Sequence, residues 1–153
     1  MEGSILGLFA APLGGVPKPS VETLHILEHG CVGDKQNDMK HHGGPNRAVC
    51  LFSTEIMNQL QSEGHPIYPG SVGENVLIQG IPWEKVSIGT QFHFDHVILE
   101  VTSDAPPCRT IKDSFLNEEF KCISVKINQH STRWYAKVIQ SGEVRTGELI
   151  VLN

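Results

Sequence analysis

The sequence predicts a mostly β protein, a single β-barrel domain over residues 1–153 with two or three short helices. Three observations support this prediction. The 15 glycines and 9 prolines recur at short intervals, the apolar runs between them are short, and strands and helices do not alternate regularly. Many short strands joined by turns, without βαβ units, favour a mostly antiparallel barrel over a doubly wound sheet.

The composition limits the classes of function. A net charge of −5 argues against a nucleic-acid-binding protein, which normally presents a basic face. The N-terminus has no positively charged segment and Gly7 interrupts its apolar run, so we expect no secretory signal. No apolar run approaches the ~20 residues of a membrane helix. We therefore expect a cytoplasmic protein with neither a membrane nor a nucleic acid as partner.

The cysteines are also informative. The chain has four of them, and no two have the CxxC spacing of a zinc ribbon or a redox dithiol. The chain is too long and too poor in cysteine for a disulfide scaffold. We therefore expect reduced thiols, most of which are small buried apolar side chains.

The first third of the chain contains two expected strands, over residues 4–11 and 21–27. Residues 28–47 contain few core-forming side chains, and a loop of this length in a compact domain is usually functional or disordered. Residues 48–52 (Ala-Val-Cys-Leu-Phe) form a continuous apolar run. This run predicts a strand that is buried on both faces.

The clearest helix follows this strand. Ser53 is a favourable N-cap, and the helix is expected to run to about Glu63 with Gly64 as its C-cap. Ile56, Met57 and Leu60 fall on one side of the helix and give it an apolar face.

The rest of the chain is expected to be mostly strands and turns. A turn is predicted over 69–73, a short helical turn over 82–85, a hairpin at Asp95-His96, a weaker helix over 111–120 and a turn at Gly142. The expected strands cover residues 75–79, 90–94, 97–102, 123–127, 134–139 and 148–152.

Cys108 is the first candidate functional residue. It lies in a proline-rich loop over residues 104–109, directly after Pro106-Pro107 and before Arg109. Two prolines fix the backbone before the thiol, and a neighbouring cation favours the thiolate, which is the nucleophilic and metal-binding form. The alternative is a buried structural cysteine at the start of a helix.

Three further segments carry polar groups suited to a ligand. In the segment 41–47, His-His-Gly-Gly-Pro-Asn-Arg, a Gly-Gly pair beside His42 and Arg47 can form a backbone amide pocket for an anion. Gly73-Glu74-Asn75 enters a strand with donors and acceptors that can bind a heterocycle. Ser53 and Thr54 stand at a helix N-terminus, which also attracts anions. Each segment has a plain structural alternative: a polar turn, a β-turn and a helix cap.

Taken together, these segments resemble the MOSC family, named for its relation to the C-terminal domain of molybdenum-cofactor sulfurase. The overall pattern resembles most the short bacterial branch associated with resistance to N-hydroxylated base analogues. The likeness runs almost from end to end, and it rests on the order and spacing of its pieces. These pieces are Val32-Gly33-Asp34-Lys35-Gln36, His42-Gly43-Gly44 with Arg47-Ala48-Val49, Gly73-Glu74-Asn75, Pro107-Cys108, Trp134-Tyr135-Ala136-Lys137-Val138-Ile139, Gly142-Glu143-Val144 and Gly147-Glu148.

The resemblance implies a β-barrel related to the small barrel domain of pyruvate kinase. It implies that Cys108 ligates the molybdenum of a molybdopterin cofactor or carries sulfur. Related enzymes reduce N-hydroxylated small molecules with electrons from a partner reductase, and pyridoxal phosphate binding is a further property ascribed to the family. The phosphate-neutralising residues would be Lys35, Arg47 and Arg109, with Ser53 and Thr54 at the helix N-terminus. The pterin pocket or the substrate side would be lined by His42, Gly43, Gly44, Glu74 and Asn75.

The chain also departs from the family pattern. It has Ser103-Asp104-Ala105 where close relatives often place an arginine-bearing stretch, and it ends at Asn153 without the additional helical region of some members. These departures leave the substrate and the docking of an electron donor open. Three functions therefore stand at this stage: a molybdenum-dependent oxidoreductase, a non-enzymatic cofactor carrier or sulfur-delivery module, and an interaction domain in which Cys108 is structural.

Overall fold

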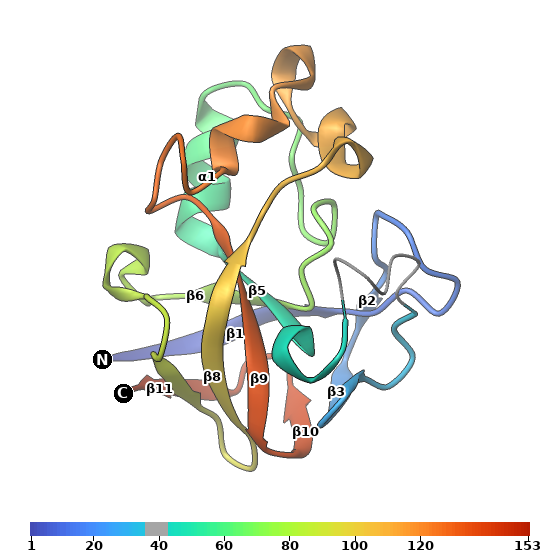
Figure 1. Cartoon of the computed structure of the whole chain (residues 1–153), viewed down its shortest axis with the longest axis vertical. Coiled ribbons are helices and arrows are strands. Elements are labelled where there is room, and N and C mark those ends of the chain that lie inside the picture. The colour runs from blue at the N-terminus through green and yellow to red at the C-terminus, as the bar shows by residue number, and fades with distance from the viewer. Residues whose placement is uncertain (36–42) are drawn as a thin grey trace.

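A computed structural model describes residues 1–35 and 43–153. Its main feature is a β-barrel, which confirms the predicted fold class (Figure 1). The seven strands of the barrel, taken over the described residues, are β1 (Glu2–Phe9), β5 (Val49–Ser53), β6 (Val76–Gln79), β7 (Gln91–His93), β8 (Ile98–Ala105), β9 (Arg133–Gln140) and β11 (Leu149–Leu152).

The barrel closes where the two ends of the chain meet. Around the barrel the order is β11-β7-β8-β9-β5-β6-β1, and β1 pairs with β11 through Glu2↔Val151 and Ser4↔Leu149. Among the described residues only β5 and β6 pair in parallel, so the barrel is mostly antiparallel, as predicted. A short strand, β2 (Ser20–Val21), extends the sheet beside β1.

The helix α1 (Thr54–Ser62) makes the parallel pairing of β5 and β6 possible, because parallel neighbours need a crossover. The Oγ of Ser53 accepts a 3.2 Å hydrogen bond from the amide of Ile56, which confirms the predicted N-cap. At the other end Gly64 has a φ of +97°, and the amides of Gly64 and His65 donate to the carbonyls of Gln61 and Leu60. This is the glycine-terminated helix end that the sequence predicts.

A second, three-stranded sheet packs beside the barrel. It consists of β10 (Gly142–Arg145), β3 (Thr23–Leu27) and β4 (Gly30–Cys31). The prediction of a turn at Gly142 is therefore wrong, since this residue begins a strand and pairs with Ile26. The four-residue strand has one buried side chain, Val144, so its sequence carries almost no alternation to detect.

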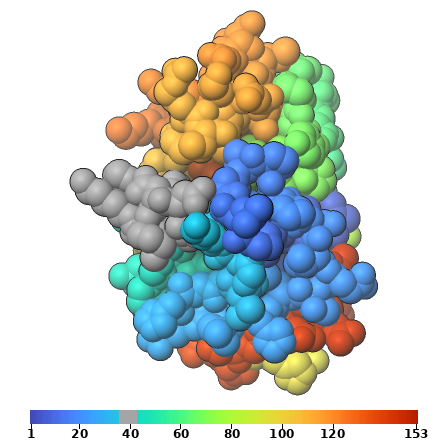
Figure 2. All heavy atoms as spheres, turned by 90° about the vertical axis from the view of Figure 1, so that its right-hand side faces the viewer, coloured from blue at the N-terminus to red at the C-terminus, as the bar shows by residue number. Residues whose placement is uncertain are grey.

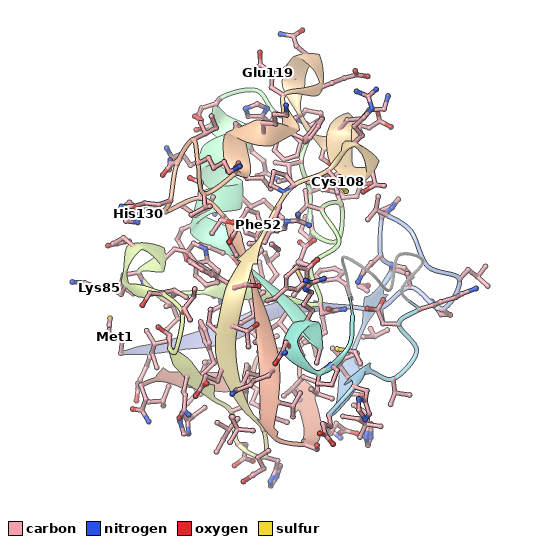
Figure 3. The ribbon with its side chains drawn as sticks, in the orientation of Figure 1. Met1, Phe52, Lys85, Cys108, Glu119 and His130 are labelled. Atoms are coloured by element: carbon pink, nitrogen blue, oxygen red, sulfur yellow. The ribbon has the colours of Figure 1, made fainter. Side chains whose placement is uncertain are left out.

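The region after Cys108 also differs from the prediction. A helix over 111–120 and a strand over 123–127 were expected, but the chain forms three 3-10 segments, η3 (Arg109–Ser114), η4 (Leu116–Glu118) and η5 (Phe120–Ile123). Asn117 has a φ of +53°, which interrupts regular helix formation. These segments lie beside α1 at one end of the molecule (Figures 1 and 2), where Glu119 is labelled in Figure 3.

Two further 3-10 segments complete the structure. The first, η1 (Pro45–Arg47), leads into β5, and the second, η2 (Trp83–Lys85), confirms the helical turn predicted over 82–85. Among residues 1–35 and 43–153, none of the helices has the length and apolar composition of a membrane-spanning segment.

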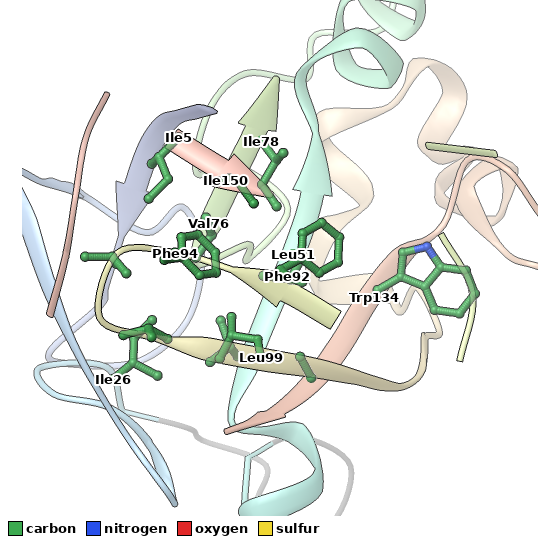
Figure 4. Packing of buried hydrophobic residues seen from close by; sticks show 14 of the residues in the cluster. Ile5, Ile26, Leu51, Val76, Ile78, Phe92, Phe94, Leu99, Trp134 and Ile150 are labelled. Atoms are coloured by element: carbon green, nitrogen blue, oxygen red, sulfur yellow. The ribbon is translucent and has the colours of Figure 1, made fainter. Parts of the chain in front are cut away.

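Most buried apolar side chains of the described residues form two cores that meet at β5, beside a third cluster of three residues. Leu51 lies in the barrel core with Phe92 and Leu99 (Figure 4), and Phe52 lies in a second core between the barrel and α1. All five residues of β5 are buried, which confirms a strand that is covered on both faces. Each fully buried large side chain contributes ~1.5–3 kcal/mol relative to an exposed one. The strand β5 is thus a rigid support for the residues at its ends.

Candidate functional site

A cavity of about 170 Å³ lies where the ends of β5, β8 and β9 meet. Cys50 reaches it from β5, Arg133 and Tyr135 from β9, and Cys108 from the segment after β8. The other lining residues are Gly15, Val16, Lys18, Lys35, Arg47, Val72, Gly73, Asn75, Thr110 and Ile111. The segments around Lys35, Arg47, Gly73 and Cys108, which are far apart in the sequence, therefore converge on one site.

Cys108 is half-buried and directly precedes η3 (Figure 3). Its Sγ lies 2.8 Å from the Oγ1 of Thr110. Cys108 belongs to none of the buried apolar clusters, which argues against a purely structural thiol. The second thiol of the cavity, Cys50, is 5% exposed, and burial raises its pKa above the ordinary range of a cysteine. Cys108 is thus the more accessible sulfur of the two.

Four cationic side chains line the cavity, although the chain as a whole carries a net charge of −5. They are Lys18, Lys35, Arg47 and Arg133, and no carboxylate stands among the described lining residues. Cations gathered around a concave site favour a ligand that carries negative charge. The site therefore suits an anionic small molecule.

Arg133 is a site residue that the sequence analysis missed. It is 4% exposed, and its Nη1 donates a 2.6 Å hydrogen bond to the carbonyl of Val72. Its Nη2 lies 3.2 Å from the carbonyl oxygens of both Ala105 and Pro106, while its buried Nε has no acceptor within the described protein. The only signal in the sequence was a charged residue at the start of an apolar strand.

Lys18 was also missed, and it belongs to a buried polar network. Its Nζ lies 2.8 Å from the Oδ2 of Asp34, which accepts a second hydrogen bond of 2.8 Å from the Nδ2 of Asn75. The Oδ1 of Asp34 accepts from the amide of Ala11 at 2.9 Å. Asp34 therefore fixes the segment that leads to Lys35 against the end of β1.

Asn75 lines the cavity, as expected. All polar atoms of its side chain form hydrogen bonds within the protein. Its Nδ2 also donates to the carbonyl of Phe9 at 3.1 Å, and its Oδ1 accepts from the amide of Cys50 at 3.0 Å. Because both amide hydrogens and the carbonyl are paired, Asn75 shapes the cavity wall rather than reading a heterocycle.

Glu74 was expected to contact a ligand, but it does not line the cavity. It is fully buried, and its two carboxylate oxygens accept hydrogen bonds from the amides of Gly70 (3.0 Å) and Val72 (3.3 Å). Burial raises the pKa of Glu74 to about 7, and the backbone hydrogen bonds oppose this shift only in part. Glu74 therefore organises the loop that presents Gly73.

Gly73 lines the cavity in a left-handed conformation that favours glycine. Its φ is +78°, and a Cβ at this position would lie 3.4 Å from the Cγ1 of Val16 and 3.9 Å from the Nη1 of Arg133. Only a residue without a side chain adopts this conformation readily and leaves the cavity wall open.

Two of the expected anion-binding residues lie elsewhere. Ser53 caps α1 and lines a separate shallow depression with Gly80 and Trp83, and the buried Oγ1 of Thr54 has no hydrogen-bond partner within the described protein. The N-terminus of α1 is thus not part of the cavity.

The remaining expected residues that the structure describes do not line the cavity. Arg109 is exposed and does not line the cavity, although its neighbour Thr110 does. Gly43 and Gly44 have φ values of +79° and +81° and lead through η1 to Arg47, without lining the cavity themselves. The expectation for His42 lies outside the described residues.

The fold and the site define a class of protein: a small β-barrel domain with an accessible thiol in a cationic cavity at one end of the barrel. The family model of the MOSC domain matches residues 38–151. The chain belongs to the MOSC domain family, which is associated with molybdenum cofactor binding.

Two curated relatives support this assignment. The chain is 28% identical over 138 residues to the uncharacterized protein YflK of Bacillus subtilis (strain 168), covering 88% of this chain and 60% of YflK. It is 26% identical over 125 residues to the protein YiiM of Escherichia coli (strain K12), covering 79% of this chain and 55% of YiiM. The chain thus spans little more than half the length of these relatives.

Solved structures share the fold. The YuaD protein from Bacillus subtilis matches with a TM-score of 0.76 and 20% identity, over 99% of this chain and 96% of that chain. YiiM from Geobacillus stearothermophilus matches with a TM-score of 0.74 and 18% identity, over 99% and 75% of the two chains. At these identities the likeness establishes the fold alone.

Proposed function

We propose that this chain binds the molybdenum cofactor at the cavity, with the thiolate of Cys108 as a metal ligand, and reduces N-hydroxylated small molecules. The observation that carries the proposal is the placement of one accessible thiol in a cavity lined by four cationic side chains, of which Lys18 is paired with the carboxylate of Asp34. The cofactor, when bound, would supply the two-electron redox chemistry. Overall, an N-hydroxyl group takes up two electrons and two protons and yields an amine and water.

The side chains that line the cavity are of the chemical types that would hold the molybdenum cofactor. A thiolate is a soft ligand suited to a metal that is bound through sulfur. Among the expected phosphate partners, the geometry favours Lys35 and Arg47, which line the cavity, over Arg109, Ser53 and Thr54, which do not. The gap left by Gly73 allows a ligand to approach the backbone closely.

The size of the cavity limits what it encloses. A site that surrounds a whole drug-sized ligand measures ~300–1,000 Å³, whereas this cavity measures about 170 Å³. The cavity would therefore enclose only the part of the cofactor next to Cys108. The exposed Lys35 would then meet a part that lies further out.

The test is the metal content of protein purified from a molybdenum-replete host. Wild-type protein is expected to contain molybdenum, and Cys108→Ala is expected to lose it. Cys122→Ala is the matched control, because Cys122 is a half-buried free cysteine outside the cavity. Molybdenum retained in Cys108→Ala at the level of the control would refute the ligand role.

A second function, a cofactor carrier or sulfur-delivery module, is favoured by the small cavity, because a carrier needs no room for a substrate beside the cofactor. Turnover of a hydroxylamine-type substrate with a chemical reductant separates the two functions. Turnover supports the reductase, and cofactor binding without turnover supports the carrier. For the reductase we propose a reductase protein as the physiological electron donor. The four cysteines are free thiols, which fits the reducing cytoplasm that we propose as the location.

A further inference from the structure

One guanidinium group joins two of the segments that line the cavity. Arg133 donates to the carbonyl of Val72, directly before Gly73, and to the carbonyls of Ala105 and Pro106, which lead to Cys108. The β8–β9 pairing sets this arrangement, because Ala105 and Arg133 are partners in its register. The distance between the two loops therefore depends on the length and shape of this one side chain.

An arginine suits this position for a geometric reason. Its planar fork presents several N–H donors in fixed directions, so one side chain can bind acceptors on two loops at once. A lysine carries the same charge but concentrates its donors on one nitrogen, which cannot reach both loops in the same way. Charge and geometry at position 133 can therefore be separated by substitution.

The charge of Arg133 is not matched by a direct ion pair. No carboxylate among the residues described forms a salt bridge with it, and all of its observed acceptors are backbone carbonyls. The nearby buried carboxyl of Glu74 directs both oxygens to the amides of Gly70 and Val72. Positive charge consequently remains in the cavity wall beside the segment that carries Cys108.

We propose that Arg133 positions Cys108 relative to Gly73 and makes the cavity select a ligand that carries negative charge next to the thiol. The proposal rests on the proposed function for the identity of the natural ligand and for the use of metal content as a readout. It deepens that function, since it assigns an anionic group to the part of the substrate or cofactor that lies beside Cys108.

The charge preference can be measured without the cofactor. Cofactor-free protein is treated with iodoacetate, an anion, and with iodoacetamide, its neutral analogue. In both reactions the thiolate sulfur forms a bond to carbon, the carbon–iodine bond breaks and iodide leaves. Because the same thiolate reacts with both reagents, the ratio of the two rates cancels its degree of ionisation. Site-specific rates at Cys108 and Cys122 are read by mass spectrometry of peptides.

Cys122 is the internal reference, because its thiol interacts electrostatically with the carboxylates of Glu63 and Glu119 rather than with cations. The iodoacetate-to-iodoacetamide ratio is expected to be higher at Cys108 than at Cys122. In Arg133→Met the ratio at Cys108 is expected to fall by about twofold to thirtyfold, the effect of one unit charge at an assumed separation of roughly 8 Å in an effective dielectric of about 80 to 20. In Arg133→Lys the ratio is expected to stay near the wild-type value.

The molybdenum content of the purified variants tests the positioning role of Arg133. Arg133→Lys is expected to lower the molybdenum content several-fold while it keeps the charge preference, and Arg145→Met, at an exposed position on β10, is expected to change neither. An Arg133→Met ratio equal to that of wild type would overturn the charge selection. Should Arg133→Met fail to fold, as judged by circular dichroism, wild-type metal content in Arg133→Lys overturns the positioning role, and equal alkylation ratios at Cys108 and Cys122 in the wild-type protein overturn the charge selection.

The two proposals can fail separately. A change in the alkylation ratio in a protein that never contains molybdenum would leave the charge preference intact and remove the proposed function. Molybdenum bound by the wild-type protein, together with an unchanged ratio in Arg133→Met, would support the proposed function and remove the charge preference.

Discussion

The Nζ of Lys18 lies 2.8 Å from the Oδ2 of Asp34, and the two side chains are only 8% and 2% exposed. This is a buried ion pair, of which Lys18 lines the cavity and Asp34 does not. Asp34 also binds the amide of Ala11 and the side chain of Asn75, so it connects the end of β1, the segment before Lys35 and the start of β6. Removing one member of a buried pair leaves the other charge without compensation.

Asp34→Asn is therefore expected to lower the free energy of unfolding by about 3–5 kcal/mol, measured by urea denaturation. The double variant Lys18→Met/Asp34→Asn is expected to recover part of this loss, because no isolated ammonium group remains buried. Asp113→Asn is the control, since Asp113 is 92% exposed and forms only a 3.8 Å surface pair. A cost at Asp34 no larger than that of the control would contradict the buried-pair interpretation.

Glu74 gives the stability of the protein a defined pH dependence. Its pKa is raised from 4.5 to about 7 by burial, so the folded state holds this proton more tightly than the unfolded state does. The stability linked to this proton is fully present below pH 4.5 and is lost as the pH rises through about 7.

Glu74→Gln removes the titrating group and resembles the protonated form. Relative to wild type, the variant is expected to gain about 3 kcal/mol in the free energy of unfolding between pH 4 and pH 8, an order-of-magnitude figure from linkage. Urea denaturation of both proteins across this range measures the difference. Parallel stability curves for the two proteins would show that the pKa of Glu74 is not raised.

Gly73→Ala is expected to reduce the occupancy of the site. The new methyl group must adopt a φ of +78° and would lie 3.4 Å from the Cγ1 of Val16, in the cavity wall. Gly147→Ala is the matched control, because its φ is +90° but no atom lies within 4 Å of the added Cβ.

Both variants are expected to lose about 1–2 kcal/mol of stability from the left-handed conformation. Only Gly73→Ala is expected to lower the molybdenum content of the purified protein, measured by elemental analysis. Equal molybdenum content in the two variants would show that Gly73 serves the turn and not the site.

The sequence predicted well those elements that depend on neighbouring residues. Ser53 and Gly64 fix the ends of α1 through hydrogen bonds within a few residues, and the unbroken apolar run in β5 requires burial on both faces. The prediction of a strand over 123–127 is wrong. Ile123 is buried, but it packs in the second core from a 3-10 segment and not from a strand. An apolar run shows that a segment is buried, but not which partner buries it.

At the site, the chemical groups could be read from the chain alone: the thiol of Cys108 after two prolines, the cations at Lys35 and Arg47, and the glycine at position 73. The grouping of these residues in one cavity, the addition of Arg133 and the supporting role of Glu74 became visible in the folded structure. The difference arises from the sequence separation over which each interaction acts. Prolines and glycines act on their own backbone, whereas the hydrogen bonds of Arg133 span 61 residues to Val72 and 28 to Ala105, and they exist only once the barrel has closed.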